Sequence, residues 1–255
     1  TQAKTLFPYT TLFRSSSLAS SQSNPVDPLL PTPLDGIVAS TSWISGPLPG
    51  VDLFRVPGRR FPLVPSIPAT NWVDPPVSLQ GQVTLSTTFG AALYGLAQRL
   101  DVHLILESGT WFGGGSSWCI AQGLRKNIAN PDKPDRWLMT MEIFEPAHTY
   151  AVQSLSRMPV TCLRGGTVGI DGYLSAAEAE SGSRNHPGGV EHFSLYYERD
   201  KALALKTPRL LPQLCSSYDF DVVLLDGNEY TGWAEFEVVR DVCKPRFLAL
   251  HDAAL

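Results

Sequence analysis

The chain of 255 residues lacks several features that would assign it to a class at once. It has no apolar run of roughly 18 residues, the length that a membrane-spanning helix needs. It also lacks the basic cluster and apolar stretch that begin a signal peptide. Its formal net charge of −4 gives no attraction to nucleic acid or to an anionic membrane. We therefore expect a small-molecule substrate, and neither nucleic acid nor membrane, as the partner.

The sequence contains four cysteines, Cys119, Cys162, Cys215 and Cys243, which lie far apart and form no CxxC motif. The paired ligands that are typical of a zinc site are therefore missing. No His-x-x-x-His pair and no GxSxG segment occurs, so zinc-hydrolase and serine-hydrolase interpretations have no support. We expect four reduced, mostly buried thiols in a cytoplasmic protein.

Methionine is missing from the first half of the chain; the three present are Met139, Met141 and Met158. The stretch TLFPYTTLFRS at residues 5–15 resembles an in-frame translation of a common short-read sequencing adapter. We therefore expect residues 1–15 to be a sequencing artefact. At the other end, Leu255 follows the last expected strand with no closing helix. We expect a fragment that is truncated at its C-terminus.

Residues 16–85 are rich in Ser and Pro. The segment SSSLASSQS has low complexity, as mobile segments often do. Prolines recur every few residues from Pro25 to Pro76, which prevents long helices and central strands. This composition predicts either a Pro/Ser-rich N-terminal arm packed on the domain or a plain linker.

From residue 86 onward, expected helices alternate with short buried strands. Apolar spacing predicts helices in residues 86–100, 118–129, 146–157, 193–214 and 230–242, with an interruption near Pro208. Short apolar runs predict strands in residues 103–107, 137–142, 160–163, 221–226 and 246–251. Residues 171–192 are polar and Gly-rich, so we expect a long loop there. The alternation predicts an α/β domain over residues 86–255 with a doubly wound, mostly parallel, Rossmann-like sheet.

Carboxylates stand at the carboxyl ends of four expected strands: Glu107, Glu142, Asp226 and Asp252. In a parallel sheet these ends lie along one edge, where ligands bind. A carboxylate buried at such an end is costly unless a partner compensates for it. Each acid alone could equally cap the next helix in solvent, but four in register favour a site.

The segment LILESGTWFGGGSS at residues 104–117 joins the first expected strand to the next helix. Glycines after a strand allow a sharp turn, and the following helix offers free N–H groups at its start. A nicotinamide-dinucleotide site would carry GxGxxG here, but Trp111 stands where the second glycine is needed. The pattern E-x-G-T-x-x-G therefore predicts a nucleotide-binding turn of another kind.

This segment resembles the first motif of class I S-adenosylmethionine-dependent methyltransferases, in which an acidic residue and a Gly-rich turn close the first strand. The resemblance implies that Glu107 lies at the amino-acid end of the cofactor. It also implies that Glu142 binds the ribose hydroxyls, since a carboxylate accepts two hydroxyl protons well. The implied cofactor-binding residues are Glu107, Gly109, Thr110, Gly113, Ser116, Glu142 and Asp226.

Two further segments, LDGNEYTG at 225–232 and LHD at 250–252, follow the last two expected strands. They resemble catechol-type O-methyltransferases, in which acids at these positions hold a Mg²⁺ ion that lowers the pKa of a substrate hydroxyl. The resemblance implies that Asp226 is catalytic and that Asp226 and Asp252 bind the metal. Without a metal, His251 is the candidate catalytic base, because its unperturbed pKa lies near neutrality. A structural hydrogen bond is the alternative role for His251.

These observations favour an S-adenosylmethionine-dependent methyltransferase that transfers a methyl group to a hydroxyl of a small molecule or sugar. Two alternatives stay open. One is a non-catalytic methyltransferase-like binding domain or inactive fragment, and the other is a NAD-dependent oxidoreductase, against which the missing GxGxxG counts.

Overall fold

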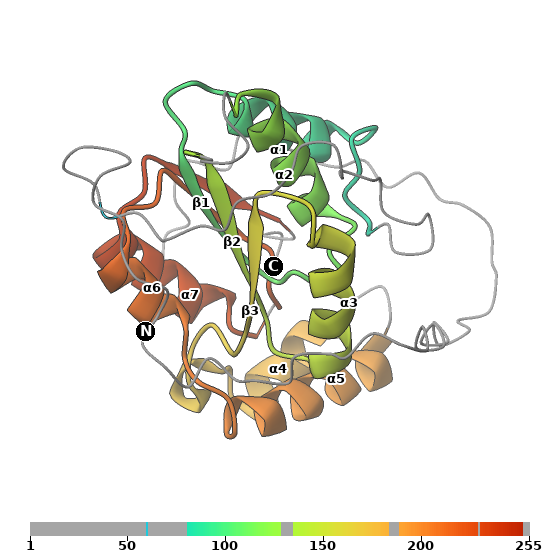
Figure 1. Ribbon diagram of the computed structural model, residues 1–255. Helices are drawn as coiled ribbons and strands as arrows, with labels where there is room; N and C mark the ends of the chain where they lie inside the picture. The colour runs from blue at the N-terminus through green and yellow to red at the C-terminus, as the bar shows by residue number, and fades with distance from the viewer. Residues whose placement is uncertain (1–59, 61–80, 129–134, 184–188, 229, 252–255) are drawn as a thin grey trace. The chain divides into compact units, whose positions relative to one another are not determined.

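The computed structural model describes residues 60, 81–128, 135–183, 189–228 and 230–251 (Figure 1). The predicted artefact at residues 1–15, nearly all of the Pro/Ser-rich arm and Asp252 lie outside these residues. Within the described part, no helix combines the length and the apolar character that crossing a membrane requires.

Five parallel strands form one sheet, with the order β3-β2-β1-β4-β5 (Figure 1). The strands are β1 Leu104–Ser108, β2 Trp137–Glu142, β3 Val160–Arg164, β4 Val222–Leu225 and β5 Phe247–Leu250. The chain runs outward from β1 through β2 to β3, and then returns to place β4 on the other side of β1. The predicted Rossmann-like α/β fold is confirmed, and its topological switch point lies between β1 and β4.

Helices cover both faces of the sheet. They are α1 Thr88–Ala97, α2 Ser116–Lys126, α3 Glu145–Leu155, α4 Ala176–Ser183, α5 Gly189–Ala204, α6 Leu211–Ser217 and α7 Gly232–Val238. The short helical turns η3 Ile170–Gly172 and η4 Val239–Cys243 complete the described elements. In Figure 1, α6 and α7 lie on the side of the sheet away from α3.

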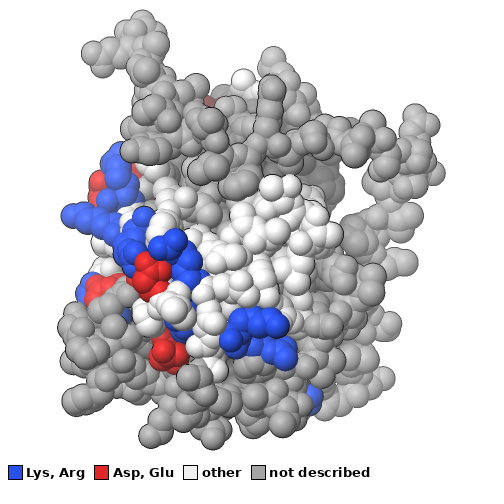
Figure 2. Space-filling model, turned by 90° about the horizontal axis from the view of Figure 1, so that it is seen from above, with Lys and Arg blue, Asp and Glu red and all other residues white. Residues whose placement is uncertain are grey.

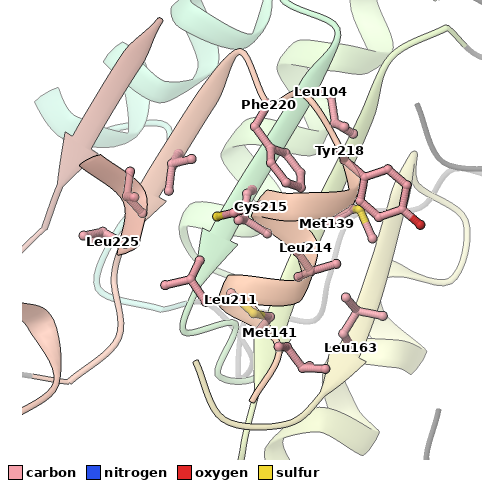
Figure 3. Packing of buried hydrophobic residues seen from close by; sticks show 14 of the residues in the cluster. Leu104, Met139, Met141, Leu163, Leu211, Leu214, Cys215, Tyr218, Phe220 and Leu225 are labelled. Atoms are coloured by element: carbon pink, nitrogen blue, oxygen red, sulfur yellow. The ribbon is translucent and has the colours of Figure 1, made fainter. Parts of the chain in front are cut away.

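Side chains alternate along β1 between two hydrophobic layers. Leu104 and Leu106 lie in the layer that also contains the leucines of α6, shown in Figure 3. Ile105 lies in the opposite layer, which α1 and α2 cover. Because Glu107 follows Ile105 at an interval of two, the alternation directs its carboxylate toward α2. The position of this acid is thus set by the packing of the strand.

The loop predicted for residues 171–192 is wrong, because α4 and the start of α5 lie there. Ser175 and Glu178 form a capping box at the start of α4. The Ser175 hydroxyl accepts the N–H of Glu178 at 3.3 Å, while the Glu178 carboxylate accepts the N–H of Ser175 at 2.9 Å. The sequence contains the motif S-x-x-E, which indicates a helix start, but the polar, Gly-rich composition around it is typical of a loop.

The expectation of four reduced thiols is wrong for two of them. Cys215 of α6 and Cys243 of η4 form a disulfide, with their Cα atoms 4.4 Å apart, whereas Cys119 and Cys162 are free. The two bonded cysteines are 28 residues apart in sequence. They meet because α6 and η4 pack together in the layer of Figure 3.

Oppositely charged side chains form ion pairs near the amino ends of the strands. Arg99 and Arg246 both bind the carboxylate of Asp101, at 3.0 and 2.6 Å, and hold its pKa below the ordinary value. Arg60 pairs with Asp219 at 2.7 Å. On the face seen in Figure 2, Lys and Arg side chains lie close together with Asp and Glu side chains among several of them. These cations are therefore matched by carboxylates.

Two helical glycines should respond in opposite directions to substitution by alanine. A Cβ at Gly123 in α2 would lie 2.5 Å from the carbonyl oxygen of Tyr94 and 2.7 Å from the Cβ of Ala97, both in α1. At Gly95 in α1 nothing lies within 4 Å. We expect Gly123→Ala to lower the free energy of unfolding by about 1–3 kcal/mol, and Gly95→Ala to raise it by about 0.5–1 kcal/mol. Urea unfolding measures both, and a stabilised Gly123→Ala variant would contradict the α1–α2 contact.

Candidate functional site

The carboxyl ends of β1, β2 and β4 come together at one edge of the sheet. The parallel register aligns Ser108 of β1 with Met141 of β2 on one side and with Leu225 of β4 on the other. Each strand then continues into a loop that carries predicted site residues. The structure thereby brings Glu107, Glu142 and Asp226 to the same edge of the sheet.

Gly109 makes the turn that follows β1. Its φ is +84°, and a Cβ there would lie 1.9 Å from the carbonyl oxygen of Asp226. The N–H groups of Gly109 and Thr110 both donate to the carbonyl oxygen of Met141, at 3.1 and 3.0 Å. Only glycine fits between the ends of β1 and β4, so this residue is required by the protein's own packing.

The rest of the loop rests on α3. Gly113 has φ +79°, and a Cβ there would lie 2.9 Å from side-chain atoms of Ser154 and Leu155. The Ser154 hydroxyl donates to the carbonyl oxygen of Phe112 at 2.8 Å. The loop is thus fixed to α3 by one close approach and one hydrogen bond.

Trp111 stands in the same loop with φ +51°, a left-handed conformation that is uncommon for a residue with a side chain. Glu142 stabilises this conformation, because its Oε2 accepts the N–H of Trp111 at 2.8 Å while its Oε1 accepts the N–H of Phe144 at 2.8 Å. The carboxylate is only 7% exposed, and burial raises its pKa to about 7 despite the two N–H donors. The acid predicted to bind ribose therefore also joins the loops after β1 and β2.

Glu107 is fully buried beneath the start of α2. Its Oε2 accepts the hydroxyl of Thr140 at 2.7 Å and also that of Ser117. Among the described residues, its Oε1 has no hydrogen-bond partner. Burial, together with the charge of the nearby Asp226, raises the pKa of Glu107 to about 7. A buried acceptor without a donor is costly, which makes this oxygen a candidate contact for a ligand.

Asp226 links three segments in front of the switch point. Its Oδ2 accepts the hydroxyl of Ser116 at 2.7 Å, and its Oδ1 lies 2.6 Å from Nδ1 of His251. The imidazole stacks on Phe89 of α1, with the ring centroids 5.1 Å apart. Both members of this Asp226–His251 pair are partly exposed. An imidazole oriented by a carboxylate is an arrangement that accepts protons in catalysis.

The other predicted site residues have the following positions. Thr110 is buried, and its hydroxyl lies 2.6 Å from that of Thr140, so it contacts the second strand directly.

The metal prediction is not tested, because Asp252 lies outside the described residues. Within the described ranges, no group of three or more His, Cys, Asp or Glu residues could hold a metal ion.

One residue of this edge was missed by sequence reasoning. Glu235 in α7 is 1% exposed, and its carboxylate lies within hydrogen-bonding distance of the hydroxyls of Ser108, Thr167 and Thr231. Burial raises its pKa. The only signal in the sequence was an acid on the apolar face of an expected helix, which does not reveal partners from other segments.

Comparisons with known proteins give structural similarity only. No family model matches the sequence, and a search of curated proteins finds no match. Cofactor-bound Rv0187 from MTB is 19% identical, with a TM-score of 0.37, and the match covers 62% of this chain and 52% of that one. The O-methyltransferase from Bacillus cereus in complex with SAH is also 19% identical, with a TM-score of 0.35 and coverage of 64% and 54%. The chain thus matches about half the length of each.

The turn after β1 should not tolerate a side chain at position 109. Gly109→Ala combines an unfavourable positive φ with the overlap with the carbonyl of Asp226, so we expect a loss of stability on the order of 2–5 kcal/mol. Gly232→Ala is the control, since nothing lies within 4 Å of a Cβ there. Urea unfolding compares the two, and equal stability of both variants would show that β1 and β4 do not approach as described.

The burial of Glu107 should make stability depend on pH. Its carboxyl group titrates near 4.5 at its ordinary pKa and near 7 in the folded protein. Between these values the folded state binds more protons, so stability decreases as pH rises. Glu107→Gln imitates the protonated form and should flatten the decline between about pH 5 and 8.

The exposed Glu180 offers the matched control for this experiment. Glu180→Gln should leave the pH dependence of the unfolding free energy as it is in the wild type. If Glu107→Gln also keeps the wild-type slope in urea unfolding at a series of pH values, the burial of Glu107 is not its source.

Proposed function

We propose that this chain binds S-adenosylmethionine at the carboxyl edge of its sheet and transfers the methyl group to a hydroxyl of a small molecule or sugar. One observation carries the proposal: the carboxylates Glu107, Glu142 and Asp226 converge around the Gly-rich turn that precedes α2. The topological switch point at this edge is where sheets of this kind bind ligands.

The charge of the site favours a cationic ligand. Glu107 and Glu142 are buried, and within the described part of the chain neither forms an ion pair with Lys or Arg. Their hydrogen-bond donors are hydroxyl and backbone N–H groups, and burial raises the pKa of Glu142 more than the charge of Arg199 lowers it. S-adenosylmethionine carries a sulfonium and an ammonium group, whereas a nicotinamide dinucleotide carries an anionic pyrophosphate. The acids therefore support the sulfonium cofactor over NAD.

The donor set also fits the separate parts of this cofactor. The unpartnered Oε1 of Glu107 would accept from the ammonium group, and Asp226 would lie toward the sulfonium end. The first N–H groups of α2, which no side chain caps, suit the carboxylate. Each oxygen of Glu142 keeps a second lone pair beside its backbone donor, so that it would still accept a ribose hydroxyl. Gly109, Thr110, Gly113 and Ser116 would surround the cofactor in this arrangement.

The Asp226–His251 pair would remove the proton of the acceptor hydroxyl. When bound, S-adenosylmethionine would supply an activated methyl group to the acceptor oxygen and leave as S-adenosylhomocysteine. Nε2 of His251 would take the hydroxyl proton, and the Asp226 carboxylate, whose Oδ1 lies 2.6 Å from Nδ1, would stabilise the charged ring. Both oxygens of Asp226 already have partners in the protein. These contacts favour the imidazole as the proton acceptor, and Mg²⁺ binding by Asp226 and Asp252 stays a prediction.

Cofactor choice can be measured directly by calorimetric titration of the full chain. We expect S-adenosylmethionine and S-adenosylhomocysteine to bind and NAD not to bind. Titration with and without Mg²⁺ tests the metal prediction in the same experiment. Absence of binding by both adenosyl compounds would overturn the proposed function.

The role of Glu142 can be isolated with an analogue of S-adenosylhomocysteine that lacks both ribose hydroxyls. Wild-type protein should bind this analogue more weakly by about 1.5–3 kcal/mol, the contribution of a hydrogen bond to a charged group. Glu142→Ala should bind both ligands with equal affinity, whereas the exposed neighbour Glu145→Ala should behave as wild type. A Glu142→Ala variant that still discriminates would mean that another group binds the ribose.

The proposed base can be tested by turnover with a panel of phenols, catechols and sugars. His251→Gln should lower kcat by about 10²–10⁴, the usual contribution of general base catalysis. Its affinity for S-adenosylhomocysteine should remain that of the wild type. Unchanged kcat in this variant would assign His251 the structural role instead.

A further inference from the structure

Glu235 is a buried acid that the proposed reaction does not use directly. It lies in the first half of α7 and is 1% exposed. Its Oε2 accepts the hydroxyl of Ser108 at 3.0 Å, and its Oε1 lies 2.5 Å from the hydroxyl of Thr167 and 2.8 Å from that of Thr231. These hydroxyls come from the end of β1, the loop after β3 and the start of α7. One carboxylate thus joins three separate segments at the carboxyl edge.

The Ser108 hydroxyl extends this contact to Asp226. Its oxygen accepts the backbone N–H of Asp226 at 3.2 Å while its proton goes to Glu235. The same N–H also lies 3.1 Å from the carbonyl oxygen of Ser108. Gly227, the next residue, would bring a Cβ within 3.0 Å of the Glu235 carboxylate. The backbone on both sides of the Asp226 side chain is therefore positioned against Glu235.

We propose that Glu235 is a positioning residue, which orients Asp226 and, through it, His251 by way of the Ser108 hydroxyl. The geometric part of this inference stands alone, and its catalytic consequence rests on the proposed function. Both oxygens of Glu235 already have hydroxyl partners in the protein, so Glu235 acts through other residues. The acid that faces Glu235 across this connection is Asp226, and the other partners of Glu235 in the described part of the chain are the neutral hydroxyls of Thr167 and Thr231.

The direction of the hydrogen bonds requires an acceptor at position 235. A hydroxyl has one proton, and the Ser108 proton is directed to Glu235 so that the oxygen can accept from Asp226. Glutamine has nearly the same shape, but its amide group would place N–H donors where the carboxylate accepts. The Ser108 hydroxyl would then have to turn, and the hold on the Asp226 backbone would weaken.

The ring tautomer of His251 reports on this connection without any substrate. The Asp226 carboxylate oxygen lies 2.6 Å from Nδ1 of His251, and a carboxylate at this distance favours the neutral form with the proton on Nδ1. Histidine ¹⁵N shifts of the full chain at alkaline pH measure the ratio of the two neutral forms, and the His251→Gln variant identifies the resonance. We expect Glu235→Gln to lower the ratio of Nδ1–H to Nε2–H roughly threefold to tenfold, the factor that a lost hydrogen bond gives.

Two further variants make the test specific. Ser108→Ala removes the connecting hydroxyl but keeps Glu235, and it should lower the ratio by a similar factor. Glu237→Gln makes the same chemical change at an exposed position of α7 and should leave the ratio unchanged. Thermal unfolding of each variant establishes that it is folded, and Ser108→Ala serves if Glu235→Gln does not fold.

The outcomes separate this inference from the proposed function. A wild-type tautomer ratio in both folded variants, or in Ser108→Ala alone, would overturn the role of Glu235. Titration with S-adenosylhomocysteine is a separate measurement, because it detects cofactor binding and not the position of the proton on His251. A changed ratio in a protein that does not bind the cofactor would support the positioning role and refute the methyltransferase proposal.

Discussion

The close approach of β1 and β4 behind Gly109 is the constraint on which the site depends. The carbonyl oxygen of Asp226 occupies the space that a side chain at position 109 would need. This contact sets the turn after β1, and it places the Asp226 side chain beside Ser116 at the start of α2. His251 then meets Asp226 because β5 pairs with β4 in parallel register. The glycine at position 109 thus allows the turn after β1 to lie directly against the end of β4.

Buried carboxylates give this edge its chemical character. Glu107, Glu142 and Glu235 are nearly inaccessible, and burial raises the pKa of each one. Hydroxyl and backbone N–H donors partly offset the desolvation of these groups, but they bring no opposite charge. Such an edge is less stable than an apolar one would be, which is a pattern found at functional sites. A cationic ligand would stabilise the charged form of these carboxylates.

Much of the fold was predictable because it depends on local patterns. The bounds of β2, Trp137–Glu142, agree with the sequence prediction, since a buried parallel strand is a short apolar run with sharp limits. The same patterns predicted all five strands in the correct order along the chain. Helix α4 was not predicted, because it lies in a polar, Gly-rich segment whose composition is typical of a loop, although its S-x-x-E motif indicates a helix start. The disulfide was missed because α6 and η4 meet only through tertiary packing.

The site was predictable only as a set of residues at one edge. Sequence position places Glu142 at a strand end, but it does not reveal that the N–H groups of Trp111 and Phe144 bind its two oxygens. The partners of Glu235 come from segments separated by up to 127 residues, as in its bond to Ser108. Contacts of this kind depend on the register of the sheet and on loop geometry, and neither is encoded in a local pattern.

The central claim is that the turn after β1 binds the adenosyl cofactor, both as S-adenosylmethionine and as its product S-adenosylhomocysteine. Amide resonances of the full chain, followed during titration with S-adenosylhomocysteine, test it most directly. The account predicts that Gly109, Trp111 and Gly113 shift together with the indole N–H of Trp111, while Gly95 on the exposed face of α1 does not. Shifts that spare the turn, or no shifts at saturating ligand, would contradict it.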